Sequence, residues 1–288
     1  MTTRPARRAA PRRPRAPGTL ADAAAAWLSG CVATQRNAKG RALAATRVRR
    51  YLLPLLGRRT LRRLTGDDVR GYRLALEARA LAPQTVAHVL ADLRALLLWA
   101  VAEGRVARTP FPRRVLPRVP ERSPRGLSAG EVTALCALPD PWGFVVRLLV
   151  ATGLRWAEAC RVRSADLCEG WLVVSHTKSG RVRRIPVSGA LAREIAARPA
   201  PVVPFAAGSP GSFTRTVRRK SGVAGFHPHR CRHTFAMRWL GAGGSLAVLQ
   251  ELLGHRDLGT TMRYARVSAE LVRREATRVE RRLRASPR

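Results

Sequence analysis

The 288-residue sequence has few acidic residues, and this shortage dominates its electrostatics. It contains 18 Asp and Glu against 54 Lys and Arg, which gives a formal net charge of +36. Hydrophobic residues make up 46% of the chain, too many for a wholly disordered basic protein. A charge balance this one-sided says little about fold, but it predicts a polyanionic partner. Nucleic acid is the first candidate, ahead of a membrane surface or an acidic protein.

Paired cysteines and long apolar runs are also lacking. The five cysteines are scattered and form no C-x-x-C pair, which is typical of a reduced protein and not of a disulfide scaffold. The apolar stretch at 23–28 follows Asp22 and is too short for an export signal. No apolar run approaches the roughly 18 residues that a membrane span needs. We therefore expect a cytoplasmic protein associated with the nucleoid and not with a membrane.

The usual motifs of nucleotide and metal chemistry are missing as well. The sequence has no G-x-x-x-x-G-K-[ST] loop, no convincing G-x-G-x-x-G after a strand and no G-x-S-x-G. The acids of the second half are scattered, whereas metal-dependent phosphodiester chemistry needs clustered carboxylates. We expect no cofactor, no metal and no small-molecule substrate.

Composition divides the chain into four parts. Residues 1–17 hold six arginines, four prolines and no acid, and predict a flexible basic arm. Residues 18–105 show helical periodicity, clearest after Pro83 and ending at Gly104. Residues 106–125 are rich in proline and arginine and predict an extended linker. Residues 126–288 form the second, larger domain.

The sequence pattern of the second domain predicts helices around one small hairpin. We therefore expect a fold class that is mainly α with a small sheet (α+β). Ser128 followed by Glu131 predicts a helix-start capping box. Apolar runs at 171–177 and 182–187 flank a Ser-Gly turn and predict two paired strands. The expected helices cover 129–137, 141–152, 188–198, 212–221, 230–240, 246–253, 260–265 and 268–284, the last with an apolar stripe at Val272, Ala276, Val279 and Leu283.

Four short segments of this domain carry the candidate chemistry. Only three residues of the chain are lysines, while 51 are arginines, and only three are tyrosines. One lysine and one tyrosine fall in these segments, with arginines and histidines beside them. The segments are ATGLRWAE with Arg155 and Glu158, HTKSGRVRR with Lys178, HPHRCRHTFA with His229, Arg232 and His233, and LGHRDLGTTMRYARV with His255 and Tyr264.

Together these side chains could act on a phosphodiester. Two arginines can bind the non-bridging oxygens, a histidine can take a proton from a phenol, and a lysine can protonate a departing sugar oxygen. Each residue alone has a simpler explanation. Arg155 could merely pair with Glu158, Lys178 could be an exposed hairpin charge, and Tyr264 could be a core aromatic. The H-x-H-x-C-x-H pattern at 227–233 matches no common zinc spacing.

The ordered set resembles the tyrosine recombinase (phage integrase) family. TGLRWAE resembles the first arginine box of that family, HTKSGRVRRIP its lysine hairpin, and H-R-C-R-H-T its H-x-x-R box. LGH, with a tyrosine nine residues after the histidine, resembles its closing box. The motifs span about 155–264, and the helical first half extends the resemblance to roughly 19–284. Cys231 and Ala157 depart from the pattern, at positions that carry no proton.

The resemblance implies roles for the matching residues. Arg155, Arg232 and His255 would hold the scissile phosphate, and Tyr264 would attack it to leave a 3′-phosphotyrosyl link. Lys178 would be the general acid, His229 would assist proton movement at the tyrosine, and Glu158 and His233 would support the site. The helical domain would bind core-site DNA, and the two domains would close as a clamp on the duplex. Family members act as tetramers on two DNA sites, and the final helix could dock on a neighbouring protomer.

Two other functions remain open at this stage. A catalytically inactive DNA-binding or architectural protein would carry the same charge. A type IB topoisomerase would use the same chemistry but would relax supercoils as a monomer. The presence of a full set of six residues in order favours a site-specific recombinase over both; the six are Arg155, Lys178, His229, Arg232, His255 and Tyr264.

Overall fold

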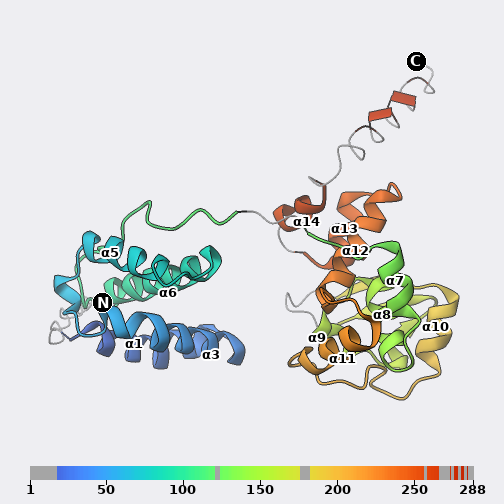
Figure 1. Ribbon diagram of the computed structural model, residues 1–288, viewed down its shortest axis with the longest axis horizontal. Coiled ribbons are helices and arrows are strands. Elements are labelled where there is room, and N and C mark those ends of the chain that lie inside the picture. The colour runs from blue at the N-terminus through green and yellow to red at the C-terminus, as the bar shows by residue number, and fades with distance from the viewer. Residues whose placement is uncertain are drawn as a thin grey trace, which may run out of the picture. The chain divides into compact units, whose positions relative to one another are not determined.

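The computed structural model describes residues 18–120, 124–175, 182–255 and 258–265, together with positions 273, 276, 277, 280, 281 and 284. The chain divides into two compact units, Met1–Glu121 and Arg122–Arg288 (Figure 1). Each unit has its own hydrophobic core. Both units are mainly helical, and a three-stranded antiparallel sheet lies in the second. The predicted fold class is confirmed.

The first unit is a helical bundle whose helices begin at polar caps. The hydroxyls of Thr19 and Thr65 each accept a hydrogen bond from the backbone N–H three residues ahead, and Asp22 and Asp68 bond back to the cap. These capping boxes satisfy N–H groups that a helix start leaves without partners. In chain order the elements are α1 (Leu20–Trp27), a π-helical stretch (Leu28–Val32), α2 (Ala33–Gln35), α3 (Ala38–Arg47), a second π-helical stretch (Val48–Leu52), α4 (Leu53–Leu56), a 3-10 turn (Leu61–Arg63), α5 (Gly66–Glu77) and α6 (Pro83–Ala102).

Helix α6 is the longest element of this unit and its central core helix. It is long and apolar enough to cross a membrane, so the expectation that no segment reaches this length was wrong. Leu90, Leu93 and Leu97 are nevertheless fully buried within the unit. Asp92 on the same helix is buried as well, and it pairs with two arginines of the bundle. Because its apolar side chains and its buried carboxylate have partners inside the bundle, α6 is a core helix and carries no argument for a membrane span.

The proline-rich segment after α6 packs on the first unit. Over residues 105–120 it forms no regular helix or strand, as its prolines predict. Val115 is only 4% exposed and belongs to the core of this unit. Its carbonyl accepts a hydrogen bond from Nη1 of Arg73 at 3.2 Å, and Nε of Arg62 donates to the carbonyl of Arg105 at 3.3 Å. Much of the expected linker is therefore anchored to α5 and its neighbours.

The second unit is organised around α8 (Trp142–Thr152), a buried apolar helix that packs against α7 (Ala129–Cys136) and α12 (Pro228–Gly241). Phe144 and Leu148 on α8 are fully buried. The capping box predicted for the start of α7 is confirmed. The described residues of this unit also form α9 (Trp156–Ala159), a 3-10 turn (Ser164–Asp166), α10 (Gly189–Ala196), α11 (Gly211–Ser221), α13 (Leu246–Leu253) and α14 (Leu258–Ala265).

The predicted hairpin is present but shorter than expected. Its strands are β2 (Trp171–Val174) and β3 (Arg183–Pro186), and β1 (Leu167–Cys168) adds a third strand that was not predicted. Leu172 pairs with Ile185 and Val174 pairs with Arg183. Val182 lies outside β3, and the expected strand end at 176–177 falls outside the described residues. The tip with Lys178 also lies outside them.

The final predicted helix is described only at single positions. Residues 273, 276, 277, 280, 281 and 284 are helical and exposed. Ala276 of the expected apolar stripe is among them, while Val272, Val279 and Leu283 lie outside the described residues.

Candidate active site

Glu158 is the centre of a buried polar network that begins where α8 ends. Gly153 closes α8 in the left-handed conformation, and Arg155 is the N-cap residue of the short helix α9. The Glu158 carboxylate accepts hydrogen bonds from the backbone N–H of Arg155 at 2.9 Å and from its Nη1 at 2.8 Å. Burial alone would raise the pKa of Glu158, but its bonds to Arg183 and Arg155 lower it to about 2. The carboxylate is therefore ionised at neutral pH.

Arg183, a residue that the sequence analysis did not single out, contacts the other side of this carboxylate. It is the first residue of β3, and its side chain is 2% exposed. Its Nη2 donates to Oε2 of Glu158 at 2.7 Å and its Nη1 donates to Oε1 at 3.3 Å. Its Nε donates to the carbonyl of Leu252 at 2.8 Å. One guanidinium thus joins β3, α9 and the end of α13.

Arg232 is buried in the site, and its side chain connects the ends of two helices. It projects from α12 and is 1% exposed. Its Nη1 donates to the carbonyl of Gly153 at 2.8 Å and its Nη2 donates to the carbonyl of Leu253 at 2.6 Å. Desolvation, and then the charge of Arg155, lower the pKa of Arg232 to about 9, which leaves it protonated at neutral pH.

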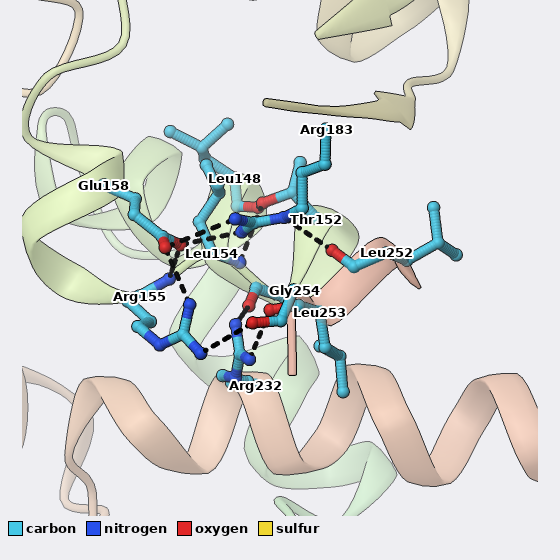
Figure 2. A network of polar contacts seen from close by, with 11 residues as sticks. Leu148, Thr152, Leu154, Arg155, Glu158, Arg183, Arg232, Leu252, Leu253 and Gly254 are labelled. Carbon is cyan, nitrogen blue, oxygen red and sulfur yellow. Dashed lines mark hydrogen bonds and ion pairs between the residues drawn. The ribbon is translucent and has the colours of Figure 1, made fainter. Parts of the chain in front are cut away.

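Backbone carbonyls at the end of α13 accept hydrogen bonds from all three arginines. Leu252 accepts from Arg183 and Leu253 from Arg232, while Gly254 accepts from Nη2 of Arg155 at 3.4 Å (Figure 2). The last carbonyls of a helix have no partner within the helix and carry the negative end of its dipole. Three consecutive peptide groups therefore hold three cationic side chains from three different elements.

His255 follows directly on this carbonyl series. Its Nδ1 lies 2.8 Å from Oγ1 of Thr261, a fully buried residue of α14. This contact fixes the ring and leaves Nε2 as the nitrogen that could meet a ligand. Burial, and then the charges of Arg232 and Arg155, lower the pKa of His255 to about 3, so the ring is neutral at pH 7.

Tyr264 on α14 directs its hydroxyl at a histidine of α12. The hydroxyl oxygen lies 2.8 Å from Nδ1 of His233, and Tyr264 is 5% exposed. The ring of His229, one helical turn earlier, stacks edge-on against His233 with their centroids 4.6 Å apart. Desolvation, and then nearby histidines and arginines, lower the pKa of His233 to about 4. A neutral His233 can accept a hydrogen bond from the phenol. The family resemblance implied assistance of proton movement for His229 and a supporting role for His233.

The H-x-H-x-C-x-H pattern does not come together as a metal site. His229 and His233 are four residues apart on one face of α12, while Cys231 is fully buried in the core of the second unit. Across the described part of the chain, no three His, Cys, Asp or Glu side chains are grouped as metal ligands.

Comparisons with known proteins identify the family of the chain. The sequence pattern of the phage integrase family matches residues 204–270. Tyrosine recombinase XerC of Bacillus licheniformis is 30% identical over 244 residues, which cover 73% of this chain and 79% of the relative. XerC of Roseiflexus sp. (strain RS-1) is 30% identical over 257 residues, which cover 77% and 82%. The chain belongs to the tyrosine recombinase family.

Solved structures agree on the fold of this tyrosine recombinase. The Tn1549 transposon integrase in complex with transposon right end DNA aligns with a TM-score of 0.74 at 19% identity, over 91% of this chain and 99% of that one. A lambda integrase dimer bound to a core site aligns with a TM-score of 0.70 at 17% identity, over 85% and 95%.

Proposed function

We propose that this tyrosine recombinase cuts and rejoins duplex DNA at specific sites through a covalent link between Tyr264 and the DNA. The observation that carries the proposal is the pairing of the Tyr264 hydroxyl with His233 in a unit that also gathers three arginines and His255. Three guanidiniums with one carboxylate leave the cluster cationic, as an anionic phosphodiester requires.

The nucleophile in this proposal is the Tyr264 hydroxyl. Its oxygen attacks the phosphorus, and its proton passes to Nδ1 of His233, which lies 2.8 Å away. His229 supports that transfer from the adjacent turn of α12. The bond between phosphorus and the 5′ oxygen breaks, and Lys178 gives a proton to the departing oxygen. The products are a 3′-phosphotyrosyl link and a free 5′-hydroxyl.

The phosphate is held by Arg155, Arg232 and His255. The Arg155 side chain is 31% exposed, so its guanidinium is the more accessible of the two arginines. Arg232 is bonded to two carbonyls and supplies a fixed positive charge. His255, held through Nδ1 by Thr261, offers Nε2 to a phosphate oxygen. These groups would stabilise charge that develops on the non-bridging oxygens.

Rejoining reverses the same steps. The 5′-hydroxyl of a second strand attacks the phosphotyrosyl phosphorus, and Tyr264 recovers its proton. One phosphate ester replaces another at each stage, so the bond energy is retained and the reaction needs neither ATP nor a metal ion. The comparisons do not favour the inactive DNA-binding protein or the type IB topoisomerase.

Double-stranded DNA is the partner, and we assign the helical unit at 18–105 to core-site binding and the unit at 126–288 to catalysis, both on one duplex. A homotetramer on two DNA sites is the proposed active assembly; a lambda integrase tetramer bound to a Holliday junction is among the similar structures. The exposed Ala276 supports docking of the last helix on a neighbouring protomer. We place the protein in the cytoplasm, on the nucleoid.

Adduct mapping tests the function directly. The full-length protein is incubated with nicked duplexes that include DNA flanking its gene, without metal or ATP. The short fragment between the cleaved bond and the nick, which carries the free 5′-hydroxyl, diffuses away. Rejoining is then impossible, and the covalent complex is trapped. The reaction is quenched in denaturant, digested and analysed by mass spectrometry. A nucleotide attached to Tyr264 is the expected result.

The two other tyrosines are internal controls. Tyr51 is half-buried and Tyr72 is 3% exposed, and both lie in the first unit. An adduct on either of them would contradict the assignment of Tyr264. No adduct at all, with salt-sensitive DNA binding intact, would instead favour a binding protein.

A further inference from the structure

The buried guanidinium of Arg183 lies behind the proposed phosphate site. We propose that Arg183 is a positioning residue: it fixes the Glu158 carboxylate and, through it, the guanidinium of Arg155 that meets the phosphate. The inference rests on the proposed function, because it concerns how the proposed phosphate site is held. It goes beyond that function in giving a role to a residue outside the set of six.

Arg183 acts through its neighbours and not on DNA. Its side chain is 2% exposed, and its three donor nitrogens already donate to Glu158 and to the carbonyl of Leu252. Arg155, by contrast, has a side chain that is 31% exposed. A phosphate can reach Arg155 while Arg183 remains behind it.

Glu158 transmits the effect because each of its oxygens serves both arginines. Oε1 accepts from Nη1 of Arg155 at 2.8 Å and from Nη1 of Arg183 at 3.3 Å. Oε2 accepts from the backbone N–H of Arg155 at 2.9 Å and from Nη2 of Arg183 at 2.7 Å. The planar fork of Arg183 therefore sets the plane of the carboxylate, which in turn orients Arg155. A lysine has a single ammonium and cannot hold both oxygens in this way.

The same residue ties the lysine hairpin to the end of α13. Arg183 begins β3, five residues after Lys178 in the chain, and its Nε holds the carbonyl of Leu252. A Cβ on Gly254 would lie 3.1 Å from Nη1 of Arg183, so the glycine makes room for this guanidinium. His255 is the next residue. Arg183 thus connects the hairpin, through Glu158, to Arg155 and, through Leu252, to the segment that leads to His255 (Figure 2).

The test compares Arg183→Lys with Arg184→Lys, its neighbour on the exposed face of β3. Because small displacements of a group that contacts the reacting centre cost up to about 100-fold in rate, we expect Arg183→Lys to slow cleavage of the nicked duplex by roughly 10- to 100-fold. DNA affinity should stay close to that of the wild type, with the variant still folded at the assay temperature. Arg184→Lys should cleave within about threefold of the wild-type rate, since on the exposed face it takes no part in the network.

A double-mutant cycle separates positioning from mere support of the fold. Arg155→Ala is combined with Arg183→Lys, and cleavage rates of the four proteins are compared. If Arg183 acts through Arg155, the double variant cleaves about as slowly as Arg155→Ala alone. Independent effects would multiply and would overturn the inference.

A second double variant tests the inference if Arg183→Lys lowers the melting midpoint. Glu158→Gln with Arg183→Gln removes both partners of the buried ion pair, so neither charge of that pair is left without the other. This folded double variant should show the same loss of cleavage with unchanged DNA affinity, and wild-type cleavage in it would overturn the inference. Failure of the proposed function has a different signature, because the wild type itself would then form no Tyr264 adduct.

Discussion

The hydroxyl of Tyr264 lies 2.8 Å from Nδ1 of His233, and both residues are largely shielded from solvent. The residue next to His233 on α12 is Arg232, whose guanidinium reaches the ends of α8 and α13. One short stretch of helix therefore presents the proposed proton acceptor and a phosphate-binding charge. In this arrangement, the nucleophile is paired with a base before DNA binds.

Replacing Tyr264 by phenylalanine removes a single hydroxyl. We expect Tyr264→Phe to abolish the covalent adduct and strand cleavage, while DNA affinity changes by less than about twofold. The lost hydrogen bond to His233 should cost about 1 kcal/mol of stability. Adduct formation and gel-shift titration on the same nicked duplex measure the two effects. Residual cleavage by this variant would mean that another group is the nucleophile.

Lys178 is predicted to matter for its proton and not for its charge. Lys178→Arg keeps the charge but offers a guanidinium that does not release a proton, so cleavage should fall by at least about 100-fold. A substrate with sulfur in place of the departing 5′ oxygen needs no proton and should restore the rate. Lys39→Arg and Lys220→Arg are matched controls that should cleave normally. Equal loss on both substrates would argue against general-acid catalysis.

Acid should destabilise the second unit through its neutral histidines. The pKa values of His233 and His255 are lowered to about 4 and about 3, so the unfolded chain takes up protons first as the pH falls below about 6.5. Stability is therefore present above that pH and decreases toward pH 4, by up to about 1.4 kcal/mol per pH unit for each histidine and less where solvent reaches the ring. Urea unfolding at pH 7, 6 and 5 measures this.

The matched variant for that series is His233→Gln, which cannot take up the proton. Its stability should fall less steeply between pH 6 and 5 than that of the wild type. If the two slopes coincide, His233 does not titrate as its burial requires.

Two glycines that end helices separate backbone strain from crowding. Gly153 and Gly222 both have positive φ, +63° and +70°. A Cβ on Gly153 would lie 2.6 Å from Cδ1 of Phe235, whereas nothing lies within 4 Å at Gly222. Gly222→Ala should cost about 1–2 kcal/mol for the backbone conformation alone. Gly153→Ala should cost about 1–3 kcal/mol more through crowding, and it should also slow cleavage, because the Gly153 carbonyl holds Arg232. Thermal unfolding and cleavage rates of the two variants provide the comparison.

The sequence predicted the elements well where local chemistry decides. The capping residues Ser128 and Glu131 marked the start of α7, and the apolar spacing after Pro83 marked α6. Strand ends were less accurate, because pairing across the hairpin and not propensity sets where β2 and β3 stop. The short strand β1 has too few residues to give a pattern.

Two features of the site depend on contacts between distant segments. Arg183 stands among many exposed arginines, and a charged residue is normally expected on the surface. The available signal was its spacing, because Arg183 lies two residues before Ile185 and therefore on the same buried face of β3. The choice between His229 and His233 as the neighbour of Tyr264 could not come from spacing, since the contact joins α12 to α14 across 31 residues.

The use of peptide carbonyls at the end of α13 has a consequence for acid–base balance in the site. Carboxylates in their place would orient the same three arginines but would cancel their charge and repel an incoming phosphate. Carbonyls carry no net charge and take up no proton in the working pH range. The positive charge of the site therefore depends little on pH, and Glu158, the carboxylate of the network, has a pKa of about 2.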